Sequence, residues 1–468
     1  MSAATTTGRV VEAHSIEPIP DAERHGRPWN LFTLWFASNI TVVAVITGAV
    51  AVSLGLSLTW SIIAMVAGNL IGGVFMAYHS VQGPQMGLPQ MIQSRAQFGS
   101  AGAVLPMIVT VLMYLGFQIE GNISFGAAMA AQTGLSVNGA LVLFGFIGIV
   151  TALFGYRVIH GLSKIMTVVT GLIFAAFLVK LISAAGSAHI PATHSTFANI
   201  LLAVSISVSW QITWAPYVSD YSRYLPSSTS ASRTFWYTYA GSVLTAVFAM
   251  LIGVLAAFVG GNGFSNDPLE YLTNLFPALN GVIFWLLMIF GFGGASGAYG
   301  SFLTAHAAVS GRGAAAERRI PLYRALFVVA FGVVSTVLSI VSSANLISTF
   351  TNITTFLLYL LVPWTAINLM DYFVIRRGSY DIPQLLLWNG RYGTFNARAV
   401  VIYLAAIGIQ IPFVNSSLYE GPIARSMGGA DIAWIVGLAF SAVAYWLAAR
   451  GDAARDRAAA RQVLLQAG

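Results

Sequence analysis

The sequence predicts an all-α integral membrane protein with twelve transmembrane helices. Hydrophobic residues make up 57% of the 468 positions and charged residues only 8%, whereas a soluble domain carries about 25% charged residues. Apolar runs of roughly 20 residues, the helix length that crosses a hydrocarbon core about 30 Å thick, recur along the chain. Polar, glycine and proline breaks divide them into expected helices at 31–56, 61–79, 101–131, 138–156, 161–185, 198–219, 233–260, 277–308, 321–343, 344–375, 398–416 and 429–450.

The distribution of basic residues predicts the orientation of these helices. An even number of spans places both termini on one side, and with cytoplasmic termini only Lys180 and Arg425 of the 22 Lys and Arg residues lie outside. Basic residues concentrate in cytoplasmic loops of membrane proteins. We therefore expect a multi-pass protein of a bacterial plasma membrane with both termini cytoplasmic. The net charge of +7 then comes from cytoplasmic loops, whose basic residues are expected to contact anionic lipid head groups of the bilayer and not nucleic acid.

The composition also limits the chemistry and the domain organisation. Cysteine is absent, which excludes disulfides and thiolate chemistry. No cofactor and no metal are expected, because the seven histidines form no ligand pair and no phosphate-binding loop is present. Residues 1–30 lack a signal peptide and are expected, like 451–468, to be a cytoplasmic tail. Between the tails we expect a ten-helix core at 31–375, with repeats at about 31–185 and 198–375, and two peripheral helices at 398–450; no oligomeric state is indicated.

The first and sixth expected helices are interrupted by polar residues and helix breakers, at 38–41 and 205–216. Unwinding a helix in hydrocarbon frees backbone N–H and C=O groups that need partners, which a polar ligand and a cation can supply. Paired interruptions five helices apart are typical of a five-plus-five inverted repeat with a central transport site. Asn39, Trp210 and Gln211 are therefore expected to bind substrate. The alternative is a proline kink whose polar residues contact neighbouring helices.

The third expected helix carries a polar and aromatic face. Tyr114, Gln118 and Asn122 are spaced four apart and share one side of the helix, with Phe117 beside them. A flat heterocycle needs stacking rings and in-plane hydrogen-bonding groups. We expect Tyr114, Phe117 and Gln118 to bind such a ring; polar contact between helices is the alternative reading.

Glu120 is an acid expected inside the membrane, on a different side of the third helix from Gln118. A charge at mid-bilayer costs at least about 2.5–3.5 kcal/mol, so such acids are usually paired, protonated or part of a proton path. Glu120 is therefore a candidate coupling residue; the alternative is a carboxyl bonded to a neighbouring helix.

Three segments resemble hallmarks of the purine-cytosine permease family within the nucleobase:cation symporter-1 family. They are GPQMGLPQMIQSRAQFG at 83–99, WAPYVSDYSRYLP at 214–226 and PWTAINLMDYFVIRRGSYD at 363–381. The resemblance spans nearly the whole chain. It implies a leucine-transporter-like fold with discontinuous helices 1 and 6, in which bundle helices 1, 2, 6 and 7 move against scaffold helices 3, 4, 8 and 9.

The same resemblance implies a secondary active transporter that imports a nucleobase or related flat heterocycle, such as cytosine, a purine, a hydantoin or allantoin. By position, the family's substrate residues fall on Tyr114, Gln118 and Trp210. Asp220, Arg223 and Asp371 lie at cytoplasmic helix ends, where salt bridges or gating contacts are expected.

The eighth expected helix departs from the family pattern. Residues 291–301, GFGGASGAYGS, have glycine or alanine where sodium-using relatives place hydroxyls and an asparagine. A cation such as sodium needs several oxygen ligands, so a proton is favoured over a sodium ion as the coupling ion. Ser296, Tyr299 and Ser301 are the polar groups left on this helix. Ser296 and Tyr299 are the candidates to replace the asparagine as a substrate contact. A glycine-rich helix also permits close packing, which is the alternative explanation.

Other functions are less well supported by the sequence. A transporter of a different small heterocycle, such as a vitamin, is the main alternative. An ion channel would need a repeated polar filter, and a membrane enzyme would need convergent acid, base or metal ligands. The chain is therefore not expected to be an enzyme.

Overall fold

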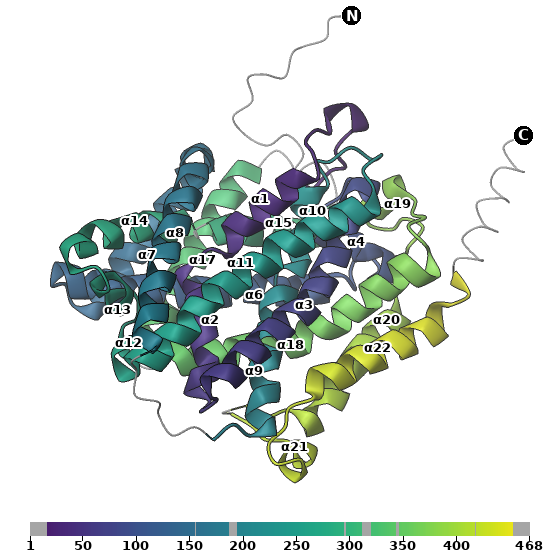
Figure 1. Cartoon of the computed structure of the whole chain (residues 1–468). Coiled ribbons are helices and arrows are strands. Elements are labelled where there is room, and N and C mark those ends of the chain that lie inside the picture. The colour runs from purple at the N-terminus through teal and green to yellow at the C-terminus, as the bar shows by residue number, and fades with distance from the viewer. Residues whose placement is uncertain are drawn as a thin grey trace, which may run out of the picture.

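The computed structural model describes residues 16–154, 156–186, 194–293, 296–310, 320–342, 346–416 and 418–452, and these form a helical assembly (Figure 1). In these ranges the β-structure is limited to one isolated bridge, between Asn415 and Glu420. Among the described residues, seven helices are individually long and apolar enough to cross a membrane, and the number rises to nine if each of two bent helix pairs is a single span. Three shorter apolar helices, α7, α20 and α22, account for the remaining expected spans.

The observed helices follow the expected order. The long elements are α1 (Trp29–Asn39), α2 (Val42–Ser53), α3 (Leu58–Met86), α6 (Val104–Thr133), α7 (Val137–Phe154), α8 (Tyr156–Ala185), α9 (Phe197–Ile212), α11 (Ala231–Gly260), α14 (Asn280–Gly293), α15 (Ser296–Val309), α17 (Ile320–Ser342), α18 (Leu346–Leu369), α20 (Ala397–Gln410) and α22 (Ala433–Ala449). The short helices are α4 (Gln90–Gln93), α5 (Arg95–Phe98), α10 (Val218–Ser222), α12 (Asn262–Asn266), α13 (Pro268–Asn274), α19 (Ile382–Leu386) and α21 (Pro422–Ser426). A π-helical turn, η4 (Met370–Ile375), follows α18.

The first span is broken between α1 and α2, and the two halves meet at an angle of 64°. Thr41 causes the break locally, because it has extended backbone and its side chain accepts a hydrogen bond from the Ala44 N–H as the N-cap of α2. The polar segment at 38–41 thus ends one helix and starts another, as expected.

The sixth span is interrupted more gently. Helix α9 ends at Ile212, a 3-10 turn (η2, Ala215–Tyr217) follows, and α10 completes a span that runs from Phe197 to Ser222. Pro216 explains the change, because it has no N–H to donate to the carbonyl of Ile212. The interruption is therefore a short turn, whereas the first span has a wide bend.

Helix α3 is longer than the sequence predicts, since it continues past residue 79 to Met86. The polar residues that suggested an end are buried and bonded inside the protein: the Ser222 hydroxyl donates to the Ser80 carbonyl, and the Gln82 amide donates to Asn368. The helix stops at Gly87, whose φ of 66° is the left-handed conformation that favours glycine.

The spans form two groups. Helix α3 packs along α9, while α11 packs along α1, α2 and α3; α6 packs against α7, α15, α17 and α18. Figure 1 shows α1, α11 and α3 running side by side. The first group corresponds to the bundle helices that the family resemblance implies, and α6, α7, α15 and α17 correspond to its scaffold helices. Helix α18, the tenth expected span, belongs to neither set and packs against both α6 and α9.

Both ends of the described chain lie at one end of the assembly. Near the start, the Arg24 guanidinium donates to the carbonyl of Pro84 at the end of α3, and the Ile19 N–H donates to the Gly87 carbonyl. Near the other end, the Tyr445 hydroxyl on α22 donates to Asp371 in η4. This arrangement agrees with an even number of membrane crossings.

Candidate functional site

Aromatic rings gather where the interrupted sixth span faces α6. The Trp210 ring lies edge-on to Phe117 of α6, with centroids 5.9 Å apart, and edge-on to Trp214 at 5.8 Å. Trp214 in turn contacts Trp35 of α1 at 5.6 Å. Bundle and scaffold helices thus meet through large flat side chains at the height of both helix interruptions.

The ring contacts continue towards the end of the sixth span. Tyr217 lies 5.8 Å from Trp214 and 5.1 Å from Tyr114 of α6, measured between ring centroids. We call Trp35, Tyr114, Phe117, Trp210, Trp214 and Tyr217 the aromatic cluster. Tyr114, Phe117 and Trp210, three residues expected to bind substrate, belong to it.

Two indole N–H groups of the cluster are buried without an acceptor in the described part of the chain: those of Trp35 and Trp214. An unsatisfied buried donor costs about 1–3 kcal/mol. A ligand with carbonyl or ring-nitrogen acceptors would remove that cost, which is the chemistry of a polar heterocycle.

The third indole, that of Trp210, is fully engaged. Its Nε1–H donates to Asn39 Oδ1 at 2.7 Å, and the Asn39 amide donates to the Ser242 hydroxyl of α11 at 3.1 Å. The Ser242 hydroxyl donates to Gln211 Oε1, whose amide group donates to Asn69 of α3 at 2.8 Å. Asn39 and Gln211 therefore bond to other bundle residues, beside the ring cluster.

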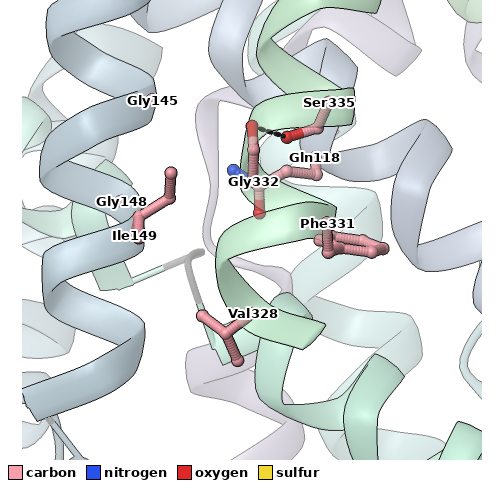
Figure 2. Close-up of a pocket in the computed structure, with 8 residues that line it drawn as sticks. All are labelled: Gln118, Gly145, Gly148, Ile149, Val328, Phe331, Gly332 and Ser335. Atoms are coloured by element: carbon pink, nitrogen blue, oxygen red, sulfur yellow. Dashed lines mark hydrogen bonds between the residues drawn. The ribbon is translucent and has the colours of Figure 1, made fainter. Parts of the chain in front are cut away.

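Gln118 points to a different place from the rings. Its amide donates to Asn122 Oδ1 one turn later, at 3.0 Å, which agrees with the predicted shared face. Figure 2 shows Gln118 at a pocket walled by α7 and α17, with Gly145, Ile149 and Gly332 among its lining residues. The cavity volume of about 10 Å³ has room for about one water molecule and not for a heterocycle.

Glu120 is 1% exposed, and neither carboxyl oxygen has a hydrogen-bond partner among the described residues. Ser124, one turn further along α6, also has a buried hydroxyl without a partner there. Ionisation of a buried carboxyl without donors is costly, so an acid in this position inside a membrane is a candidate for proton uptake and release.

Asp220 and Arg223 connect the end of the sixth span to two other segments. Asp220 Oδ1 accepts from the backbone N–H of Gln90 in α4 at 2.8 Å. The Arg223 guanidinium donates to the backbone carbonyl of Asp220 at 3.2 Å and to that of Glu17 at 3.4 Å. They attach α10 to the loop after α3 and to the N-terminal segment.

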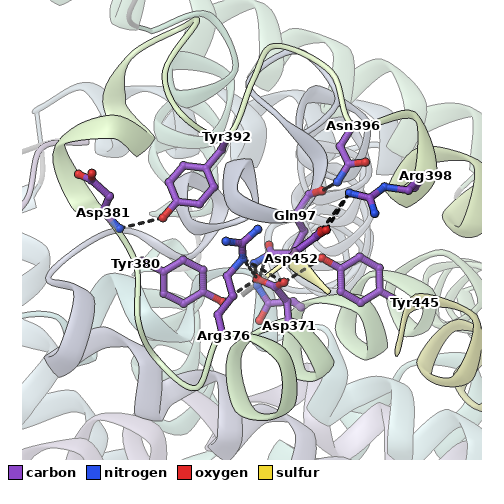
Figure 3. Close-up of polar contacts among 11 residues, drawn as sticks. Gln97, Asp371, Arg376, Tyr380, Asp381, Tyr392, Asn396, Arg398, Tyr445 and Asp452 are labelled. Carbon is purple, nitrogen blue, oxygen red and sulfur yellow. Dashed lines mark hydrogen bonds and ion pairs between the residues drawn. The ribbon is translucent and has the colours of Figure 1, made fainter. Parts of the chain in front are cut away.

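Asp371 is the centre of a buried polar hub, shown in Figure 3. Its carboxylate pairs with Arg376 at 3.2 Å and accepts from Gln97, Tyr380 and Tyr445 at 2.7–2.9 Å. Burial, and then the nearby carboxylate, raises the pKa of Tyr380 well above its usual value, so this hydroxyl remains a donor. The expected salt bridge at Asp371 is present.

Two expected substrate residues, Ser296 and Tyr299, have side chains outside the part of the structure that is described; only their backbone, in α15, is placed. The described residues contain no group of three or more His, Cys, Asp or Glu suited to a metal ion.

The sequence reasoning missed several residues of this region: Trp35, Trp214, Tyr217, Asn69 and Ser242. A signal existed for two of them, because Trp210, Trp214 and Tyr217 are spaced by four and then three residues and so share a helical face. Asn69 and Ser242 gave no such signal, since their partners are far away in the chain.

Comparisons with known proteins agree with this picture. A family described as permease for cytosine/purines, uracil, thiamine, allantoin matches residues 18–437. YxlA, a putative purine-cytosine permease of Bacillus subtilis, is 37% identical over 443 residues, which cover 93% of this chain and 95% of that protein. These relatives are described as permeases, as expected for a transporter and not for an enzyme.

Two solved structures have a similar fold. Mhp1 in its inward-facing conformation superposes with a TM-score of 0.74 at 19% identity, covering 96% of this chain and 95% of that one. Mhp1 as a nucleobase-cation-symport-1 family transporter, in a closed conformation with bromovinylhydantoin bound, gives 0.72 at 18% identity, covering 93% and 94%. The predicted fold, with interrupted first and sixth helices, is therefore confirmed.

Proposed function

The chain belongs to the family of permeases for cytosine/purines, uracil, thiamine and allantoin, and from this premise we propose that it imports a nucleobase or a related flat heterocycle. Cytosine, purines, hydantoins and allantoin are the candidate cargoes. Transport is by alternating access, in which the bundle of α1, α2, α3, α9, α10 and α11 moves against the scaffold around α6.

The aromatic cluster is the observation that supports this proposal most directly. Rings from the bundle meet Phe117 and Tyr114 of the scaffold at the level of the two helix interruptions. A flat ring can stack on such side chains. The indole N–H groups of Trp35 and Trp214, which have no acceptor among the described residues, can donate to its carbonyl or ring-nitrogen atoms. Movement of the bundle away from α6 opens the space for it.

The proposed coupling ion is a proton. Residues 291–301 carry glycine and alanine at most positions and so offer few side-chain oxygens to a sodium ion. Glu120 supplies a carboxyl that is buried, without a partner in the described chain, and on the same helix as two rings of the cluster. Proton binding at Glu120 can then be linked to the position of α6.

The proposed orientation has both termini in the cytoplasm. The shared end of the assembly holds Arg24, Arg223, Arg376 and Arg398, and basic residues favour the cytoplasmic face. Import then carries cargo from the face near the loop between α20 and α22 to the face near η4.

Uptake by cells that express the protein tests the proposal. Labelled cytosine, adenine, hypoxanthine, uracil, allantoin and thiamine are offered with and without a proton uncoupler, in sodium and in potassium buffer. We expect at least one base or hydantoin-like ring to accumulate, and the uncoupler to abolish accumulation in both buffers. Thiamine uptake alone would favour the vitamin alternative, and no uptake of any ring would reject the substrate class.

Substitution at the cluster makes the test specific. Trp210→Ala removes the ring that faces Phe117 and is expected to abolish uptake at normal membrane abundance. The matched control is Trp60→Ala, because Trp60 is 43% exposed on α3. Equal losses of uptake in the two variants would contradict a role of Trp210 in substrate binding.

A further inference from the structure

Four side-chain hydrogen bonds link five buried residues from four helices of the bundle. The first runs from Trp210 to Asn39, the second from Asn39 to Ser242, the third from Ser242 to Gln211 and the fourth from Gln211 to Asn69. Their lengths are 2.7, 3.1, 2.7 and 2.8 Å. We call these five residues the Trp210 chain; they come from α9, α1, α11 and α3.

The donor in every bond of the chain is determined by its two ends, the Trp210 indole N–H and the Asn69 NH₂ group that faces the Met65 carbonyl. An indole N–H can only donate, so Asn39 must present its oxygen to Trp210 and its NH₂ group to Ser242. The Ser242 hydroxyl then gives its proton to Gln211 Oε1, and the Gln211 amide gives one to Asn69. The Asn69 amide ends the chain by donating to the Met65 carbonyl at 2.9 Å. No flipped amide is compatible with this order.

Burial makes the order costly to break. Trp210 is 2% exposed and the other four side chains are fully buried, so a broken bond leaves a polar atom without water to replace its partner. Bonds in such a series also polarise and strengthen one another. Loss of any one hydrogen bond in the chain therefore weakens the bond between Asn39 and the Trp210 indole N–H, which keeps the indole in its orientation.

The helix backbones that carry the chain are close together. A Cβ atom at Gly72 of α3 would lie 2.8 Å from the Gln211 Cβ and 2.7 Å from the Val208 carbonyl oxygen. A Cβ atom at Gly241 of α11 would lie 2.6 Å from the Phe32 carbonyl oxygen of α1. Only glycine allows these approaches, so the helices that carry the chain pack backbone against backbone at these positions.

We propose that the Trp210 chain holds the Trp210 indole in the single orientation that packs on the substrate ring. Asn39, Ser242, Gln211 and Asn69 are then positioning residues, which act on substrate affinity through Trp210 without touching the substrate. This inference rests on the proposed function for its effect on uptake, but the hold on the indole itself can be measured without substrate.

The first experiment measures that hold directly. The protein contains 11 tryptophans, and ¹⁵N-tryptophan labelling in lipid nanodiscs gives their indole N–H signals; the signal lost in Trp210→Phe identifies Trp210. We expect slow hydrogen exchange at this N–H, and exchange about tenfold faster in Ser242→Ala, the loss expected for one removed hydrogen bond.

Thr245→Val is the matched control. Thr245 lies on the same helix and is equally buried, but its hydroxyl donates only to the Gly241 carbonyl of its own helix. Indole exchange in this variant should equal that of the wild type. If Ser242→Ala leaves the exchange of Trp210 unchanged, or if Thr245→Val accelerates it to the same extent, the proposed hold is rejected.

The second experiment measures uptake of the labelled base that the wild type transports best from the panel above. Ser242→Ala should raise KM about tenfold with the maximal rate within about twofold, and Ser242→Thr, which keeps the hydroxyl, should restore KM. The double variant Ser242→Ala/Asn69→Ala should raise KM no further than the more severe single variant, because both interrupt one chain.

The outcomes separate the two proposals. Faster indole exchange without a change in KM rejects the positioning role and leaves the proposed function intact. A wild type that takes up no base rejects the proposed function, and with it the effect on affinity, while the exchange measurement still decides whether the chain holds Trp210. A loss of thermal stability alone, with normal exchange and KM, shows that the chain only stabilises the bundle.

Discussion

Buried polar side chains in this protein differ in whether they are hydrogen-bonded. The Trp210 N–H and the four residues linked to it are all hydrogen-bonded. Glu120 of α6 is also buried, but neither of its carboxyl oxygens has a hydrogen-bond partner in the described chain. Hydrogen-bonded groups stabilise the conformation in which their bonds are made. An unbonded buried carboxylate is costly, and the cost is removed when the carboxyl binds a proton or when another conformation provides a partner. Glu120 is therefore the residue at which coupling is tested first.

Glu120→Gln keeps the size of the side chain but removes its ability to exchange a proton. We expect uptake against a gradient to fall at least tenfold, while exchange of labelled for unlabelled base across the membrane persists. The control is Glu270→Gln, at an exposed carboxyl on α13, which should leave accumulation unchanged. Full accumulation by Glu120→Gln in energised cells would assign Glu120 a structural role.

At the level of elements, η4 joins parts of the chain that are distant in sequence. Asp371 receives hydrogen bonds from Gln97 in α5 and Tyr445 in α22, besides its pair with Arg376. The sequence predicts two peripheral helices at 398–450, where the structure has α20 and α22. The Tyr445 hydroxyl of α22 donates to Asp371 in η4, the turn that follows α18. The hub thus links the end of the tenth span and α22 to the segment that follows α3.

Asp371→Asn is expected to lower stability strongly. Removal of one partner from a buried ion pair costs about 3–5 kcal/mol, because it leaves the other charge buried and uncompensated. Glu420→Gln breaks a pair with Arg425 whose members are 36% and 71% exposed, and such surface pairs contribute at most about 1 kcal/mol. Thermal unfolding in one detergent measures both; comparable shifts in melting temperature would contradict the hub.

At the level of the whole molecule, one end of the assembly carries both ends of the described chain and the polar contacts of α4, α5, α10 and η4. The opposite end carries the connection between α20 and α22. With cytoplasmic termini, the first end faces the cytoplasm. The absence of cysteine makes this orientation simple to measure.

Single cysteines at opposite ends provide the measurement. Leu418→Cys lies in the connection from α20 to α22, at a side chain 85% exposed. Ser228→Cys lies in the loop after α10, whose Ser227 carbonyl accepts from Gln85 at the end of α3. A membrane-impermeant maleimide should label the first in intact cells and the second only after permeabilisation; the reverse pattern would invert the topology.

The sequence was most informative where the bilayer limits the possibilities. Hydrocarbon thickness fixes the length of a span, so the twelve helices were predictable, and Thr41 and Pro216 marked both interruptions through their local backbone preferences. Helix α3 extended past its predicted end because buried partners from α10 and α18 satisfy Ser80 and Gln82. Such partners are distant in the chain and leave no local pattern.

The candidate site was predictable only in part, for the same reason. Rings on helical faces were found by their spacing, as Tyr114 and Phe117 show. The bonds of Asn39 and Gln211 were not predictable, because Ser242 and Asn69 become their neighbours only through packing of α11 and α3. Gln118 was expected near the rings, and its pocket on the α7 side follows from the tertiary arrangement.

The fixed donor order of the Trp210 chain also limits which substitutions can accumulate at its positions during evolution. A substitution that reverses one donor, for instance an acid in place of Asn39, leaves two acceptors facing each other unless the next position changes as well. Descendants of this sequence therefore have two viable routes: retain all five residues, or replace several of them together. Positions 39, 69, 210, 211 and 242 should accordingly vary as one unit among relatives, while Thr245, whose bond stays within its own helix, varies independently.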